Sequence, residues 1–286
     1  MELMFETLLT AMKNELSDLR FEKRLTTGEV RRVSAKYFRK LPKDKPSVFD
    51  FCQRLLEFRI WELTIIAYDW AYRMRHYYDE TTFEVFEYWL KNYISDWWDC
   101  DDFCTHAFGE LMIRFPQLMI RVFDWCDHKN FAVRRAAPVV LILPIKKRAF
   151  LSVDPLAVAD HLKFDPHYLV LKGYGWMLKV LSQTDDMKVI AYLEQNSQMP
   201  RVAYRYALEK LDPDVKKHLM KLIAFPVDVK ALFAKCYLFF NKFVCCPFEN
   251  RENILCNRID IDTGEFCHSA GRQRLDIFYE YRGADT

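Results

Sequence analysis

Hydrophobic residues recur at intervals of three and four along most of the chain, which places them on one face of an α-helix. The pattern begins with Leu3, Leu8, Leu9, Met12, Leu16 and Leu19, and it returns in residues 48–60, 61–74 and 82–94. Prolines and short polar groups separate these segments, as at Pro116 and Pro200, and such residues typically start or stop helices. Segments of this length with short joints predict an all-α chain built of helical pairs.

Five of the predicted helices share a frame when they are aligned on a small residue near their middle. These residues are Ala67, Cys104, Ala137, Gly175 and Ala207, with successive spacings of 37, 33, 38 and 32 residues. The period is close to one antiparallel helix pair per unit, and stacked pairs build a solenoid with a concave inner wall. We therefore expect a helical-repeat solenoid, with an irregular helical bundle as the alternative.

The position two residues before each small residue gathers the candidate chemistry. In chain order it holds Ile65, Asp102, Arg135, Gly173 and Arg205. Equivalent positions on stacked helices point the same way, and helical spacing adds Trp98, four residues before Asp102, and Trp176, three residues after Gly173. Indole faces attract cations and guanidinium groups bind phosphate. The frame thus predicts a concave basic and aromatic cleft that holds one carboxylate.

The composition narrows the class of protein. The chain has 286 residues, of which 51% are hydrophobic, so it folds into a globular body. With only 7 glycines and no GxGxxG or GxxxxGK[ST] pattern, dinucleotide- and phosphate-binding loops are excluded. The net charge is +2, and any affinity for nucleic acid must therefore come from basic residues gathered on one face.

The last 64 residues, from residue 223 onward, differ from the rest of the chain: they hold five of the nine cysteines, and the helical pattern fades after about residue 244. These cysteines are Cys236, Cys245, Cys246, Cys256 and Cys267, and their spacing is unlike the paired ligands of zinc sites. We predict a domain over residues 1–222, a short cysteine-containing C-terminal extension over 223–286, and no metal site. The odd number of cysteines favours reduced thiols and a cytoplasmic protein.

Membrane insertion and secretion are not expected. The first residues include Glu2 and Glu6 and lack the basic start of a signal peptide. The longest uncharged apolar run, residues 136–145, is half of the ~20 residues that a membrane span needs.

Four sequence elements follow one another at the spacing of the repeat. They are WWDCDD at 97–102, FAVRRAA at 131–137, KGYGWMLK at 172–179 and MPRVAYRYALE at 199–209. In order, spacing and content they resemble the AlkD-type DNA alkylation repair glycosylases, which are built from HEAT-like repeats. The resemblance covers roughly residues 1–222. It implies an enzyme of base excision repair that hydrolyses the N-glycosidic bond of positively charged N3- and N7-alkylated purines in duplex DNA, without a metal or cofactor.

The resemblance also assigns roles to residues. It implies that Asp102 is the catalytic aspartate and that Trp98 and Trp176 are the two tryptophans that pack on the sugar. Arg135 corresponds to the arginine that contacts phosphate. Further candidate contacts to the DNA backbone are Arg134, Lys172, Lys179 and Arg205.

These residue types suit the chemistry. A cationic alkylpurine leaves readily, so the remaining barrier is the oxocarbenium-like sugar, as in glycoside hydrolysis. An ionised Asp102 stabilises that cation, and one such electrostatic group is typically worth ~3–4 kcal/mol. Cation–π attraction from Trp98 and Trp176 adds roughly 0.5–2 kcal/mol.

Plainer interpretations stand beside these roles. Asp96 and Asp99 lie at a predicted helix start and are expected to cap it, whereas Asp102 lies nearly two turns inside. The arginines are alternatively a solvated face, and Arg205 has Glu209 as a possible partner four residues on. At the level of function, the alternative is a non-catalytic helical-repeat scaffold that binds DNA or a protein. An acid in a DNA-binding cleft repels phosphate, which favours the enzyme. We expect a monomer, nucleoid-associated if the protein is bacterial.

Overall fold

The computed structural model describes residues 2–22 and 24–223, and every regular element in this part is helical. The prediction of an all-α chain is confirmed for these residues. The predicted extension and its five cysteines lie outside the described residues, so the domain boundary at 222 stays a prediction.

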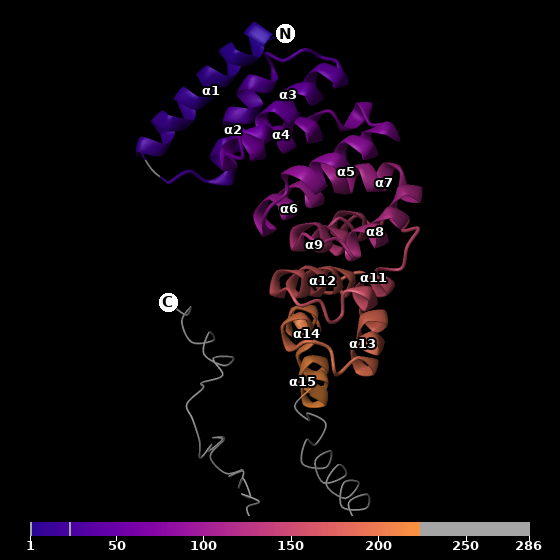
Figure 1. Cartoon of the computed structure of the whole chain (residues 1–286). Coiled ribbons are helices and arrows are strands. Elements are labelled where there is room, and N and C mark those ends of the chain that lie inside the picture. Colours follow the sequence, from indigo (N-terminus) through magenta and orange to yellow (C-terminus); the bar gives the residue numbers. More distant parts are fainter. Residues whose placement is uncertain (1, 23, 224–286) are drawn as a thin grey trace, which may run out of the picture. The chain divides into compact units, whose positions relative to one another are not determined.

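Successive helices of one row carry the frame residues. This row consists of α4 (Trp61–Arg73), α6 (Trp97–Phe103), α9 (Phe131–Val139), α12 (Tyr168–Leu181) and α14 (Arg201–Leu208). Each helix of the row packs against the next one (Figure 1).

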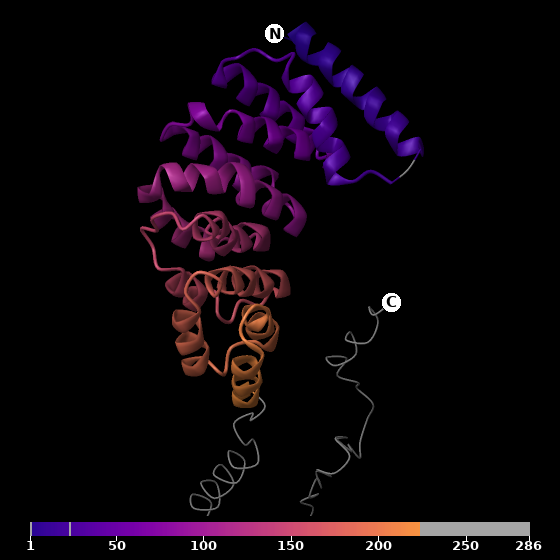
Figure 2. The ribbon, with the colours of Figure 1, turned by 180° about the vertical axis from the view of Figure 1, so that it is seen from behind.

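A second row of helices lies beside the first in both views of the ribbon (Figures 1 and 2). It consists of α3 (Lys45–Glu57), α5 (Thr81–Tyr93), α7 (Gly109–Arg114), α8 (Val122–Cys126), α11 (Pro155–His161) and α13 (Asp186–Gln195). The remaining elements are α1 (Glu2–Glu22), α2 (Thr27–Phe38), α10 (Ile142–Lys146) and α15 (Pro213–Ile223), the 3₁₀ turns η1 (Arg75–Tyr77) and η3 (Pro116–Arg121), and the π-helical turn η2 (Cys104–Phe108). Contacts between the rows, such as α3 with α4 and α8 with α9, produce the helical pairs that the sequence predicts.

One small residue of the frame, Gly175, sits where two neighbouring helices approach closely. A Cβ atom on Gly175 of α12 would lie 2.8 Å from the carbonyl oxygen of Ala203 in α14 and 2.9 Å from Cβ of Tyr206. Only glycine permits this approach, because no real Cβ atom tolerates such distances. Cys104 differs from the expectation of a mid-helix position, since it begins the π-helical turn after α6.

Aromatic side chains fill the space between the rows. Trp70, Trp89 and Trp125 are at most 1% exposed and belong to the core. In residues 2–22 and 24–223 there is no helix with the length and hydrophobicity of a membrane span.

Candidate functional site

The start of α6 is fixed by its own acidic residues. Asp96 is the N-cap, and the side chain of Asp99 accepts hydrogen bonds from the backbone N–H groups of Ser95 at 2.9 Å and Asp96 at 3.0 Å. Asp99 is only 2% exposed. The predicted capping role of Asp96 and Asp99 is confirmed, and it leaves the two later acids of the helix for other work.

Asp101 forms a buried ion pair with Arg135 of α9. The guanidinium donates from Nε to Oδ1 and from Nη2 to Oδ2, both at 2.8 Å, and from Nη1 to the backbone oxygen of Leu169. The Arg135 side chain is 6% exposed, and it lies over Gly173, where a Cβ would come within 3.1 Å of its Cγ. The arginine predicted to bind phosphate therefore has all three guanidinium nitrogens bound within the protein.

Asp102 is held differently. Its Oδ1 accepts a hydrogen bond from Nη2 of Arg31 in α2 and lies 3.8 Å from Nδ1 of His106, which also lies 2.8 Å from the Asp102 backbone oxygen. No hydrogen bond in the described part of the chain uses Oδ2 of Asp102. In this part, Tyr68 Oη is the one fully buried side-chain N or O atom that lacks a hydrogen-bond partner. Oδ2 is therefore not fully buried. It follows that Oδ2 reaches solvent, although the side chain as a whole is only 11% exposed.

Asp102 lines a cavity of about 660 Å³, which we call the Asp102 cavity. It is lined by Arg20, Arg24, Leu25, Thr27, Trp61, Glu62, Ile65, Trp97, Trp98, Asp101, Asp102, Thr105 and His106. The indole of Trp98 shares the cavity with the Asp102 carboxylate, as the sequence predicts. Glu62, the third acid of the lining, forms an ion pair with Arg20 of α1. Each acid that lines this cavity thus has an arginine partner from another helix.

A second cavity of about 460 Å³ adjoins the first one, and we call it the Trp176 cavity. Its lining residues are Trp97, Asp101, Arg135, Leu169, Lys172, Trp176, Lys179 and Tyr206. Trp97 and Asp101 line both cavities. The structure therefore places Trp98 and Asp102 in the lining of one cavity, and it places Trp176 in the neighbouring cavity beside the basic residues.

Three of the predicted DNA contacts, Arg135, Lys172 and Lys179, line the Trp176 cavity. The Nζ atom of Lys172 lies 4.2 Å from the ring centroid of Tyr168 and 5.7 Å from that of Tyr206, while Nζ of Lys179 binds Glu209 at 2.8 Å. Arg205 is exposed on α14. The sequence alternative paired Glu209 with Arg205, but its partner is Lys179.

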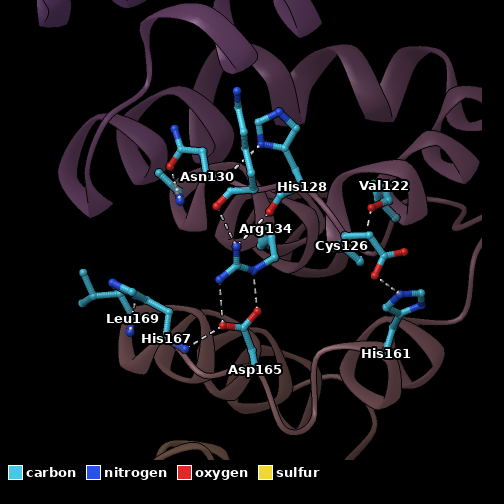
Figure 3. Close-up of polar contacts among 12 residues, drawn as sticks. Val122, Cys126, His128, Asn130, Arg134, His161, Asp165, His167 and Leu169 are labelled. Carbon is cyan, nitrogen blue, oxygen red and sulfur yellow. Dashed lines mark hydrogen bonds and ion pairs between the residues drawn. The ribbon is translucent and has the colours of Figure 1, made fainter.

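Arg134 has a structural partner on the next unit. Its Nε and Nη2 bind the Asp165 carboxylate at 2.6 and 3.2 Å, and its Nη1 donates to the backbone oxygens of His128 and Lys129 (Figure 3). Asp165 also accepts from the backbone N–H of His167, the N-cap of α12. This arrangement connects α9 to the start of α12, and a DNA contact by Arg134 stays a prediction.

The electrostatics of the two acids follow from their burial and their partners. Burial raises the pKa of Asp102 above its ordinary value, and the charges of Arg31 and His106 partly counteract that effect. Burial likewise raises the pKa of Asp101, and the hydrogen bonds from Arg135 act in the opposite direction. Because Arg135 binds both oxygens of Asp101, Asp102 is more available than Asp101 to act on a bound molecule.

Sequence reasoning missed three residues of this site. Arg31 lies on α2, outside the five helices of the frame, and 71 positions before its partner. Asp101 lies 34 positions before Arg135, close to the mean spacing of 35 between the frame residues. His106 lines the Asp102 cavity as well. Within the described residues, no group of three or more His, Cys, Asp or Glu side chains is arranged to hold a metal ion.

Comparisons with known proteins agree with the resemblance. A family model described as DNA alkylation repair enzyme matches residues 25–211, which is more than half of the chain. No curated protein matches the sequence. A solved structure, described as a predicted DNA alkylation repair enzyme from Enterococcus faecalis, is similar to this chain with a TM-score of 0.55 and 16% identity, over 66% of this chain and 87% of that one. At this identity the structural likeness concerns the fold. The family match includes every lining residue of the two cavities except Arg20 and Arg24, and the chain belongs to the DNA alkylation repair enzyme family.

Proposed function

We propose that this protein is a DNA glycosylase that removes positively charged N3- and N7-alkylated purines from duplex DNA. In this proposal the two rows of helices form a HEAT-like solenoid, and the Asp102 and Trp176 cavities lie along its concave, DNA-facing cleft. The observation that carries the proposal is the position of Asp102, a mostly buried carboxylate in the lining of a cavity that also holds Trp61, Trp97 and Trp98.

The proposed chemistry is electrostatic. As the cationic base departs, positive charge develops on the deoxyribose, and the Asp102 carboxylate stabilises it and orients the attacking water. Trp98 packs on the sugar within the same cavity, and Trp176 supports the adjoining nucleotide. Lys172, Lys179 and the exposed Arg205 neutralise phosphates without reading sequence.

The distribution of charge argues for catalysis over simple binding. A surface that only binds DNA gains nothing from acids, yet Asp102 faces the cavity that adjoins the basic residues. Its burial needs compensation by Arg31, which indicates that the carboxylate is built for a specific use. A non-catalytic scaffold with the same surface would bind duplex DNA in a salt-dependent manner and release no base.

The test is release of 7-methylguanine from methylated duplex DNA by the wild type and by Asp102→Asn. Loss of the anionic oxygen should slow the reaction about 10²–10³-fold. Asp50→Asn is the matched control, because Asp50 is an exposed aspartate on α3, and circular dichroism establishes that each variant is folded. Equal rates for wild type and Asp102→Asn would remove Asp102 from the mechanism, and no release by folded wild type would refute the glycosylase.

A further inference from the structure

Arg31 touches the one carboxylate on which the proposed function depends, and it comes from a distant element. It lies on α2, whose start is set by a capping box between Thr26 and Glu29. Its side chain is 33% exposed, compared with 11% for Asp102. A surface arginine that only contacted solvent would not bind a residue of α6 that lies 71 positions further along the chain.

The geometry of the pair is asymmetric. Arg31 binds Oδ1 of Asp102, and the nearest approach of His106 is also to Oδ1. In the neighbouring pair, by contrast, Arg135 occupies both oxygens of Asp101. One pair is therefore closed, and the other leaves an oxygen exposed.

We propose that Arg31 is the positioning residue of this site: by binding Oδ1 it fixes the Asp102 carboxylate so that Oδ2 faces the deoxyribose of the bound nucleotide. This inference rests on the proposed glycosylase function. A held carboxylate meets the developing cation without reorganising, which is the source of most electrostatic catalysis. Arg31 does not touch the reacting atoms and acts through Asp102.

The same contact keeps the carboxylate charged. Burial raises the pKa of Asp102, and the nearby carboxylates of Asp69 on α4 and Asp101 on α6 raise it further. Arg31 and His106 are the groups that lower it. Without Arg31 the carboxyl binds a proton at a higher pH, and the fraction that is ionised near neutrality falls.

The experiment compares wild type, Arg31→Gln, Arg31→Lys and Arg32→Gln. Arg32 is an exposed residue of the same helix, so Arg32→Gln removes the same charge without removing the contact to Asp102. For each protein, kcat and KM for release of 7-methylguanine from methylated duplex DNA are measured as a function of pH. The ionisation of Asp102 in the DNA-free protein is followed by carboxyl NMR, with Asp102→Asn to assign the signal.

We expect Arg31→Gln to lower kcat by up to about 100-fold with little change in KM. Its acid limb should move to higher pH, together with the NMR titration of Asp102. Arg31→Lys should restore part of kcat because it keeps a cation at the site, and Arg32→Gln should match the wild type.

Three results would overturn the role of Arg31. These are an unchanged kcat and pH profile in Arg31→Gln, a rise in KM alone, which would make Arg31 a DNA contact, and a faster reaction, which would mean that Arg31 shields the carboxylate. Wild-type protein that releases no base would instead refute the proposed function, and the NMR titration would still report whether Arg31 controls the ionisation of Asp102.

Discussion

The ion pair between Asp101 and Arg135 should dominate the stability of the region between the two cavities. Asp101→Asn removes the charge that compensates Arg135, whose side chain is 6% exposed, and it replaces an acceptor of the bond at 2.8 Å with an amide that donates. Breaking a buried pair by removing one partner costs about 3–5 kcal/mol, because the other charge is left uncompensated. For a domain of this size, that corresponds to a fall in Tm of about 6–20 °C.

The assay is urea denaturation followed by circular dichroism, with thermal melting as a second measure. Lys147→Gln is the matched control, because Lys147 binds Glu110 at the same 2.8 Å but is 48% exposed, and exposed pairs contribute about 0–1 kcal/mol. A double variant, Asp101→Asn with Arg135→Met, should be more stable than Asp101→Asn alone, since it no longer buries a lone charge. A loss of less than about 1 kcal/mol in Asp101→Asn would contradict the buried pair.

Three further outcomes can be measured. Gly175→Ala should destabilise the protein by about 1–3 kcal/mol in urea denaturation, because the new Cβ would lie 2.8 Å from the Ala203 carbonyl oxygen. Gly28→Ala is the control: its Cβ would contact only Thr26 Oγ1 at 3.9 Å, and it should stabilise the protein by up to about 1 kcal/mol. Equal effects of the two substitutions would exclude close helix packing at Gly175. Lys172→Ala should reduce the salt dependence of duplex binding by about one unit of slope in a fluorescence anisotropy titration, whereas an unchanged slope would place Lys172 away from phosphate. Burial raises the pKa of Asp102, and the proposed reaction needs its anion. We therefore expect kcat/KM to fall as the pH falls through that raised pKa, at a higher pH than for an exposed aspartate. A rate that is independent of pH in the acid range, after subtraction of spontaneous depurination, would argue against a catalytic carboxylate.

The fold was readable from the sequence because its signals are local. Helical periodicity and the helix-breaking effect of proline depend on neighbours within a few turns of the chain, and the small residues of the frame recur once per repeat unit. Capping by Asp99 was equally predictable, since its distance from the helix start decides the role. Asp102 lies further from the helix start than Asp99, too far to cap the helix, and this position marked it as a candidate for another role.

Partners across helices were not readable. Arg135 and Asp102 occupy equivalent frame positions, which suggested two free groups on one wall, yet Arg135 binds Asp101 and lies buried over Gly173. Arg134 likewise forms an ion pair with Asp165 and does not extend into solvent as a solvated face would. Whether an arginine contacts DNA or a carboxylate of the next unit depends on how far its side chain extends across the stack of helices. The spacing of residues along the sequence does not specify that.

The π-helical turn η2 has a consequence for how this chain tolerates change. A π turn takes up one residue more than an α turn, and such turns often occur next to functional sites. Here it begins directly after α6, and α7 continues from it at Gly109, where a Cβ would meet the Cys104 carbonyl at 2.6 Å and Leu143 of α10 at 2.9 Å. Since the turn holds one residue more than an α turn, deleting one residue from 104–108 would convert it to an α turn and leave the downstream helix in its orientation. A deletion inside α6 has no such extra residue to remove, and it would rotate the acids by about 100° relative to the helix that follows. The chain should therefore tolerate the loss of a residue in this turn better than in the helix before it.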